Sequence, residues 1–279
     1  MPELPEVETI KLQLKQKILG KTIKNIEILS KKNFIGKSET VVNQKIVDIS
    51  RCGKVIAIEL SNNLYLNLHM KLTGQLLFAK NMKRPVFETD IPFTKTNKMP
   101  ANTTRVIIYF TDGSGLFFND LRKFGWIKVN NQPEQLKGID VLSKDFSVKY
   151  LTAIVTSTTR PIKIILMDQD KIAGIGNIYA NDALFLSKIN PLRRSKTLAT
   201  LEINNLYKAI KKVIEQGLKH GGSSGADEAY IRPDGKKGEH QRYFMVYQRE
   251  GKPCPRCKTP IRRVKHGGRS SFYCPKCQK

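Results

Sequence analysis

Hydrophobic residues recur at helical spacing close to the start of the chain. Residues 5–19 place Val7, Ile10 and Leu14 on one face, so they predict an amphipathic helix that ends at Gly20. From residue 22 to about residue 129 the pattern changes to short apolar runs separated by turn residues. The clearest candidate strands are residues 54–60, 64–68, 104–110 and 115–119. Short strands at this spacing predict a β-sandwich or a barrel.

Two stretches lack regular periodicity. Residues 80–102 are polar and contain proline, so we expect a long loop there. Residues 221–240 are rich in glycine and charge, and we expect a second, mobile loop. Both loops lie between segments with clear apolar patterns.

Helical periodicity returns after a link at residues 130–145. Four candidate helices follow, at residues 147–157, 160–168, 177–189 and 198–218. Gly174 and Gly176 form a GxG turn directly before Asn177, which opens the third of these helices. A glycine-bearing turn at a helix N-terminus can bind an anion, although many such turns only change the chain direction.

Charge narrows the class of partner. The 279 residues include 49 Lys and Arg against 24 Asp and Glu, a net charge of +25. This excess predicts a polyanionic partner, for which a nucleic acid and an anionic membrane surface are the two candidates. The chain has no long apolar run and no signal peptide, so we expect neither a membrane span nor export.

Cysteine spacing predicts a metal site in the tail. Four of the five cysteines form two CxxC pairs, Cys254, Cys257, Cys274 and Cys277. Four thiolates at this spacing close a tetrahedral zinc site and leave no position for water, so we expect one structural Zn²⁺. Buried structural thiols are the alternative, which the polar surroundings disfavour. The tail from residue 252 onward is also rich in Lys and Arg without any acid, which favours phosphate binding.

The first residues carry candidate covalent chemistry. Removal of Met1 would leave Pro2 with a free secondary amine, whose pKa of roughly 7.7–8.0 lies far below that of lysine. Such an amine can attack an electrophilic sugar carbon, with Glu3 beside it to move a proton. The competing interpretation is that Pro5 and the acids simply start a helix.

Three separated stretches together resemble the bacterial formamidopyrimidine-DNA glycosylases. They are residues 1–9 (MPELPEVET), 168–185 (DQDKIAGIGNIYANDALF) and 269–279 (RSSFYCPKCQK). The resemblance implies an α+β fold, in which an N-terminal β-sandwich with its helix precedes a helix-two-turns-helix domain and a zinc finger. We place these domains at residues 1–130, 131–240 and 241–279. The run after Met-Pro-Glu favours the purine-specific branch over the endonuclease VIII group.

The resemblance also implies roles for individual residues. Pro2 matches the nucleophile that attacks C1′, Glu3 the acid at the sugar ring oxygen, and Glu6 a supporting carboxylate. Lys54 matches a lysine at the site that contacts phosphate beside the lesion. Asn177 and Arg269 match two further phosphate contacts.

Three more side chains match those that fill the gap left by an extruded base. Arg122 would bond the orphaned cytosine, and Phe124 would wedge beside it, unless it is a plain core aromatic. The third position is usually methionine in relatives, and here Leu72 takes it, with Met70 close by. Other departures are Cys52 in place of an arginine, Asn102 where a histidine is common, and an unusual loop at 222–238, which in relatives covers the base.

We therefore expect a base-excision repair enzyme that removes oxidised purines from duplex DNA and cleaves the abasic site by β,δ-elimination. It would act as a cytoplasmic, nucleoid-associated monomer without an organic cofactor. A non-catalytic, zinc-dependent protein that binds damaged DNA is the alternative, and an RNA-associated zinc ribbon protein is a third.

Overall fold

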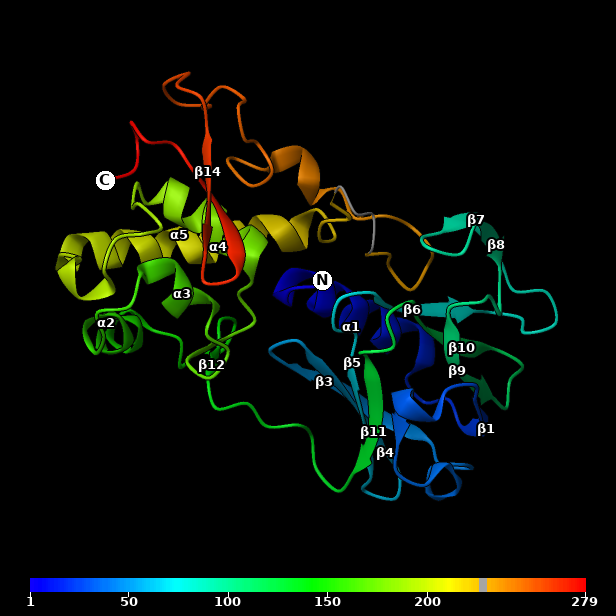
Figure 1. Cartoon of the computed structure of the whole chain (residues 1–279). Helices are drawn as coiled ribbons and strands as arrows, with labels where there is room; N and C mark the ends of the chain where they lie inside the picture. Colours follow the sequence, from blue (N-terminus) through cyan, green and yellow to red (C-terminus); the bar gives the residue numbers. More distant parts are fainter. Residues whose placement is uncertain (226–229) are drawn as a thin grey trace. The chain divides into compact units, whose positions relative to one another are not determined.

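The computed structural model describes residues 1–225 and 230–279 (Figure 1), so part of the loop predicted at 222–238 lies outside the described residues. The chain forms two compact units. Unit 1 comprises Met1–Gln135 and Leu218–Gln241, and unit 2 comprises Leu136–Gly217 and Arg242–Lys279. The segment from Leu218 to Gln241 thus packs with the N-terminal unit.

Unit 1 is a β-sandwich with the helix α1 (Leu4–Ile18) packed against it. One sheet has the strand order β1-β9-β10-β6, and the other has the order β2-β11-β5-β4-β3. The first contains β1 (Ile23–Ile28), β6 (Gly74–Ala79), β9 (Thr104–Phe110) and β10 (Gly115–Asp120). The second contains β2 (Phe34–Ile35), β3 (Ile46–Cys52), β4 (Val55–Leu60), β5 (Tyr65–His69) and β11 (Trp126–Asn130). The predicted helix and strands are confirmed, and the two sheets select the sandwich over the barrel.

The main core lies between the two sheets and includes the apolar face of α1. On β9, Val106, Ile108 and Phe110 point into it, as alternation requires. Ile107 on the same strand joins a second cluster on the opposite face of that sheet. Over β6, β9 and β10, both faces of the four-stranded sheet are therefore buried, which explains why these strands are apolar at consecutive positions. The edge strand β1 has both buried and exposed residues instead.

The prediction of a loop at residues 80–102 was wrong in part, because a hairpin forms there. Its strands are β7 (Val86–Ile91) and β8 (Thr96–Lys98), and they pair antiparallel. Phe87 and Ile91 are buried in the second cluster, while the residues between them are exposed. The few inward-facing residues of a short, otherwise polar hairpin give a weak pattern, which the sequence interpretation missed.

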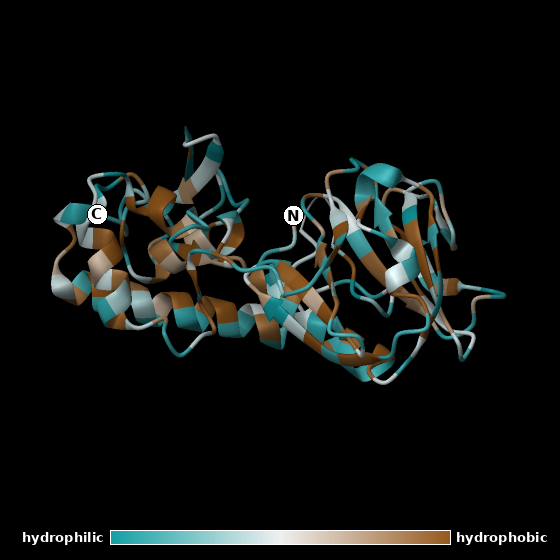
Figure 2. Ribbon diagram, turned by 90° about the horizontal axis from the view of Figure 1, so that it is seen from below, coloured by the Kyte–Doolittle hydropathy of each residue, from teal (hydrophilic) through white to brown (hydrophobic). Residues whose placement is uncertain are grey.

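Unit 2 contains the helices α2 (Val148–Thr156), α3 (Ile162–Met167), α4 (Asn177–Leu186) and most of α5 (Thr200–Lys219). They confirm the four predicted helices. Two short strands, β12 (Ile139–Asp140) and β13 (Ile172–Ala173), pair in parallel, and β14 (Arg262–His266) forms a hairpin with β15 (Arg269–Tyr273). Hydrophobic and hydrophilic stretches alternate along α5 (Figure 2), as an amphipathic helix requires. Among the described residues, no helix has the length and apolar character needed to cross a membrane.

Candidate active site and DNA-binding residues

The N-terminus of α1 brings two carboxyl groups together in unit 1. Pro2, Glu3 and Glu6 are all buried, and Glu3 and Glu6 are only 3% and 1% exposed. The Glu3 N–H donates to Glu6 Oε2 at 2.8 Å, and the Ser223 N–H donates to Glu6 Oε1 at 2.7 Å. Each Glu6 oxygen therefore holds a backbone amide, which is what a carboxylate in a positioning role should do.

Lys54 lies in the tight turn between β3 and β4. Gly53 before it has φ +55°, a conformation that glycine adopts without strain. Lys54 is 6% exposed. The positive charge of its ammonium group lowers the pKa of His69, which lies at the end of β5. The β3–β4 turn therefore brings positive charge to the end of β5.

His69 is a residue that sequence reasoning missed. Burial, followed by the charges of Lys71, Lys54 and Lys128, lowers the pKa of His69 to about 3. The ring is therefore neutral at neutral pH, and its Nδ1 accepts a hydrogen bond from the Lys71 N–H at 2.9 Å. The lysines around it create a positive potential that suits a phosphate group.

The three predicted gap-filling side chains lie on two loops of unit 1. Met70 is 1% exposed and belongs to the main core, so Leu72, which is partly exposed, remains the candidate for the third position. Phe124 is 47% exposed, and the Arg122 guanidinium lies 5.0 Å from its ring centroid. Phe124 is thus not a core aromatic, and its exposed ring is available for stacking.

Asp120, fully buried at the end of β10, ties these two loops together. Thr73, next to Leu72, donates its hydroxyl to Asp120 Oδ1. The same oxygen accepts from the Arg122 N–H at 3.2 Å, and Oδ2 accepts from the Gly125 N–H at 2.6 Å. Sequence reasoning missed Asp120, although its place directly before the Leu-Arg-Lys-Phe run was a usable signal.

In unit 2, Asn181 joins the first turn of α4 to β15. Its Nδ2 donates to the Asn177 carbonyl at 2.6 Å, and its Oδ1 accepts from the Phe272 N–H at 2.7 Å. Asn177 opens α4, and the exposed Arg269 opens β15. The two predicted phosphate contacts therefore lie on neighbouring elements (Figure 1). Asn177 and Asn181 are four residues apart, which is about one helical turn, and this spacing was the sequence signal for the bond between them.

The cysteines of the tail gather as their spacing predicts. The sulfurs of Cys254, Cys257, Cys274 and Cys277 all lie within 4.8 Å of one another. Tetrahedral zinc with Zn–S bonds of about 2.3 Å requires sulfurs roughly 3.8 Å apart, so this donor set fits the ion. The Arg256 N–H also points to Cys254 Sγ at 3.4 Å.

Arg256 in the first knuckle docks the metal site on α4. Its guanidinium donates to the carbonyls of Phe185 and Leu186 at 2.8 and 2.9 Å. These carbonyls belong to the last turn of the helix, where a cation is favoured by the helix dipole. The finger is therefore bonded to α4 at two places, at Asn181 in its middle and at the carbonyls of its last turn.

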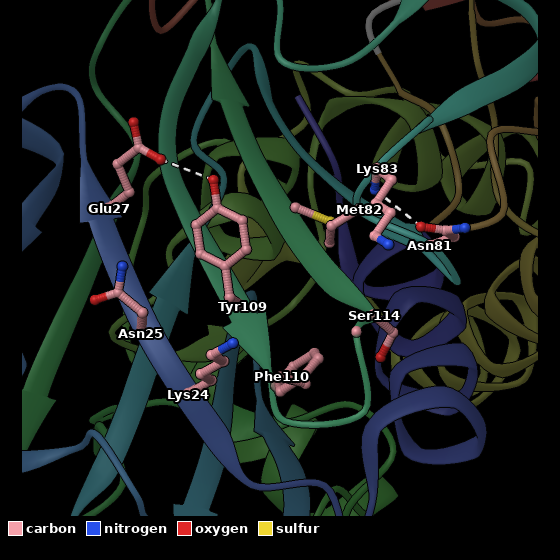
Figure 3. Close-up of a pocket in the computed structure, with 10 residues that line it drawn as sticks. Lys24, Asn25, Glu27, Asn81, Met82, Lys83, Tyr109, Phe110 and Ser114 are labelled. Carbon is pink, nitrogen blue, oxygen red and sulfur yellow. Dashed lines mark hydrogen bonds between the residues drawn. The ribbon is translucent and has the colours of Figure 1, made fainter.

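An open cavity of about 450 Å³ lies elsewhere in unit 1, beside β1 and β9 (Figure 3). The Tyr109 hydroxyl in its wall donates to Glu27 at 2.8 Å. Burial, then this bond, raises the pKa of Tyr109 to about 12. No residue that we predicted for the site lines this cavity.

Models of three protein domains match the chain. The formamidopyrimidine-DNA glycosylase N-terminal domain matches residues 1–127, and the H2TH domain of the same enzymes matches residues 137–228. A zinc finger found in FPG and IleRS matches residues 251–279. The chain belongs to the formamidopyrimidine-DNA glycosylase family.

Whole-length relatives agree with this membership. The chain is 38% identical to the formamidopyrimidine-DNA glycosylase of Pelotomaculum thermopropionicum, over all of this chain and 99% of the relative. It is similar in structure to the MutM (Fpg) protein of Thermus thermophilus, with a TM-score of 0.87, 30% identity and coverage of 99% and 98% of the two chains. A Lactococcus lactis Fpg in complex with abasic-site DNA gives a TM-score of 0.84 at 26% identity, covering 99% of each chain.

The enzyme class follows from the family, which consists of DNA glycosylases that also cleave abasic sites. The resemblance inferred from three short stretches is thus confirmed over the whole chain, as is the α+β fold with its zinc finger. The partner of this family member is damaged double-stranded DNA. Its structural metal is zinc, held by the four cysteines.

Proposed function

We propose that this protein removes oxidised purines, such as 8-oxoguanine and formamidopyrimidines, from duplex DNA with Pro2 as its covalent nucleophile. The supporting observation is the buried N-terminus of α1, where Pro2 is adjacent to Glu3 and Glu6 holds the Glu3 amide at 2.8 Å. Attack on a sugar carbon requires a nucleophile, which the secondary amine supplies. Protonation of the sugar ring requires an acid, which the adjacent carboxyl group supplies.

The reaction has four steps in this proposal. The Pro2 nitrogen, freed by removal of Met1, bonds to C1′ while the damaged base leaves. Glu3 protonates the ring oxygen, so the sugar opens and an iminium ion forms. The iminium makes the C2′ proton acidic, and its loss breaks the bond to the 3′ phosphate. A second elimination breaks the bond to the 5′ phosphate.

The DNA is held by groups on both units. Lys54, Asn177 and Arg269 bind phosphates, and Leu72, Arg122 and Phe124 fill the gap in the stack when the base is extruded. Extrusion costs a few kcal/mol, which these contacts offset. One chain supplies every group, so the enzyme acts as a monomer, and its substrate places it in the cytoplasm on nucleoid DNA.

Borohydride trapping tests the nucleophile. Protein whose mass shows that Met1 is absent should form a covalent complex with an 8-oxoguanine duplex. Acylation of the terminal nitrogen should abolish both trapping and excision. Excision at the normal rate by the acylated protein would contradict the role of Pro2, and binding of the lesion without turnover would favour the non-catalytic alternative.

A further inference from the structure

The four-stranded sheet of unit 1 needs a cover on its second face. That cover has two parts, the β7–β8 hairpin and the residues that follow Tyr230. Together with the sheet they form a buried cluster, the outer core, which contains Leu77, Ala79, Phe87, Ile91, Met99, Ile107, Phe117 and Ile231. Phe87 is 8% exposed and Ile231 is 1% exposed, so hairpin and segment share one apolar contact region.

Two further contacts fix residues 230–235 beside the hairpin. The Phe78 N–H of the edge strand β6 donates to the Pro233 carbonyl at 2.8 Å. Gly235 has φ +83°, and a Cβ atom at this position would lie 2.7 Å from Phe87 Cδ1. The backbone at Gly235 therefore packs directly on the Phe87 ring, and no larger residue fits without displacing it.

Hydrogen bonds continue from this region to the candidate active site. Ser224 Oγ donates to the Tyr230 carbonyl at 2.9 Å and accepts from the Gly238 N–H at 2.9 Å. The neighbouring residue, Ser223, donates its N–H to Glu6 at 2.7 Å. All of these contacts and hydrogen bonds join residues of unit 1, so the connection from the hairpin to Glu6 lies within one compact unit.

We propose that the β7–β8 hairpin is a brace that holds the described parts of the 218–241 segment, residues 218–225 and 230–241, against Glu6, with Phe87 as its main positioning residue. This inference rests on the proposed function of Glu3 and Glu6. Glu6 holds the Glu3 amide, so displacement of the segment displaces the acid as well. Errors of about 1 Å in a catalytic group cost up to about a hundredfold in rate.

The two activities should respond differently. Base excision needs Glu3 in place while the C1′–N bond breaks and the closed sugar ring opens. An abasic site has no base to expel, and its open-chain aldehyde condenses directly with the Pro2 amine. Loss of the brace should therefore slow excision far more than cleavage of an abasic duplex.

Phe87→Ala is the test, with Val86→Ala as its control on the same strand, since Val86 is 56% exposed. We expect single-turnover excision of 8-oxoguanine to fall about tenfold to a hundredfold in Phe87→Ala, while abasic-site cleavage stays near wild type. Phe87→Leu should restore most of the loss. Hydrogen exchange at the Ser223 and Gly238 amides should rise in Phe87→Ala, with the β9 amides still protected.

Gly235→Ala provides a second variant, which disturbs the contact between residue 235 and the Phe87 ring. It leaves the identity of every outer-core side chain unchanged. It should show the same selective loss of excision. Equal loss of both activities, or unchanged excision in both variants, would overturn the brace. If wild-type protein lacks trapping and excision, the proposed function itself fails, and that result is seen before any variant is made.

Discussion

Replacement of Asp120 by alanine tests how the gap-filling loops are held. Asp120 is fully buried and accepts from the Thr73 hydroxyl, the Arg122 N–H and the Gly125 N–H. Gly125 is buried, so its N–H would lose its acceptor at a cost of about 1–3 kcal/mol. The Arg122 N–H keeps a second acceptor, Thr73 Oγ at 3.1 Å, so it adds little to the loss. The Thr73 side chain is partly exposed, so water replaces much of the bond that its hydroxyl loses, at a cost of about 0.5–1.5 kcal/mol.

The sum predicts a destabilisation of about 1.5–4.5 kcal/mol for Asp120→Ala. For a unit of this size, that corresponds to a fall in Tm of roughly 3–18 °C. Asp120→Asn should lose less, because its amide can turn the oxygen toward Gly125 while the NH₂ group faces the Thr73 hydroxyl. Asp90→Ala, at an exposed aspartate, is the control and should leave Tm unchanged within error.

Function provides the more specific assay. In Asp120→Ala the loops that carry Leu72, Arg122 and Phe124 lose their common anchor, so excision should slow and the preference for cytosine opposite the lesion should weaken. Affinity for an undamaged duplex should stay, since Lys54 is on another turn. A destabilised variant that keeps its excision rate and pairing preference would refute this account, and so would a general loss of DNA binding.

Three further predictions concern metal, charge and pH. Removal of zinc by a chelator should unfold the finger and abolish tight DNA binding, with recovery on addition of zinc; unchanged affinity after verified removal would refute the role of the metal. Lys54→Ala should weaken binding to all duplexes and flatten the salt slope by about one, whereas Arg122→Ala should change only discrimination of the opposite base. Folding lowers the pKa of His69 from 6.5 to about 3. Between these two pH values, His69 is therefore protonated in the unfolded chain and neutral in the folded chain. Stability should fall as pH falls through that window, by at most about 1.4 kcal/mol per pH unit, and urea unfolding of His69→Gln should show a shallower dependence.

The elements that the sequence predicted well are those with a local signal. The face of α1 with Val7, Ile10 and Leu14 repeats within one helix, and each CxxC pair sets two sulfurs on one short turn. In the β7–β8 hairpin, by contrast, only Phe87 and Ile91 of β7 are buried, too few to produce a period. The tie between Asp120 and Thr73 was equally hidden, because 47 residues separate them.

By itself, the sequence determined the helices, most strands, the zinc ligands and the family, because periodicity and close spacing are properties of neighbouring residues. Only the tertiary structure decided that the 218–241 segment joins unit 1 and bonds Glu6 through Ser223. It also decided which cover lies on the second face of the four-stranded sheet. An apolar run indicates that a surface must be buried. Which distant segment covers that surface depends on the shape of the assembled sheet.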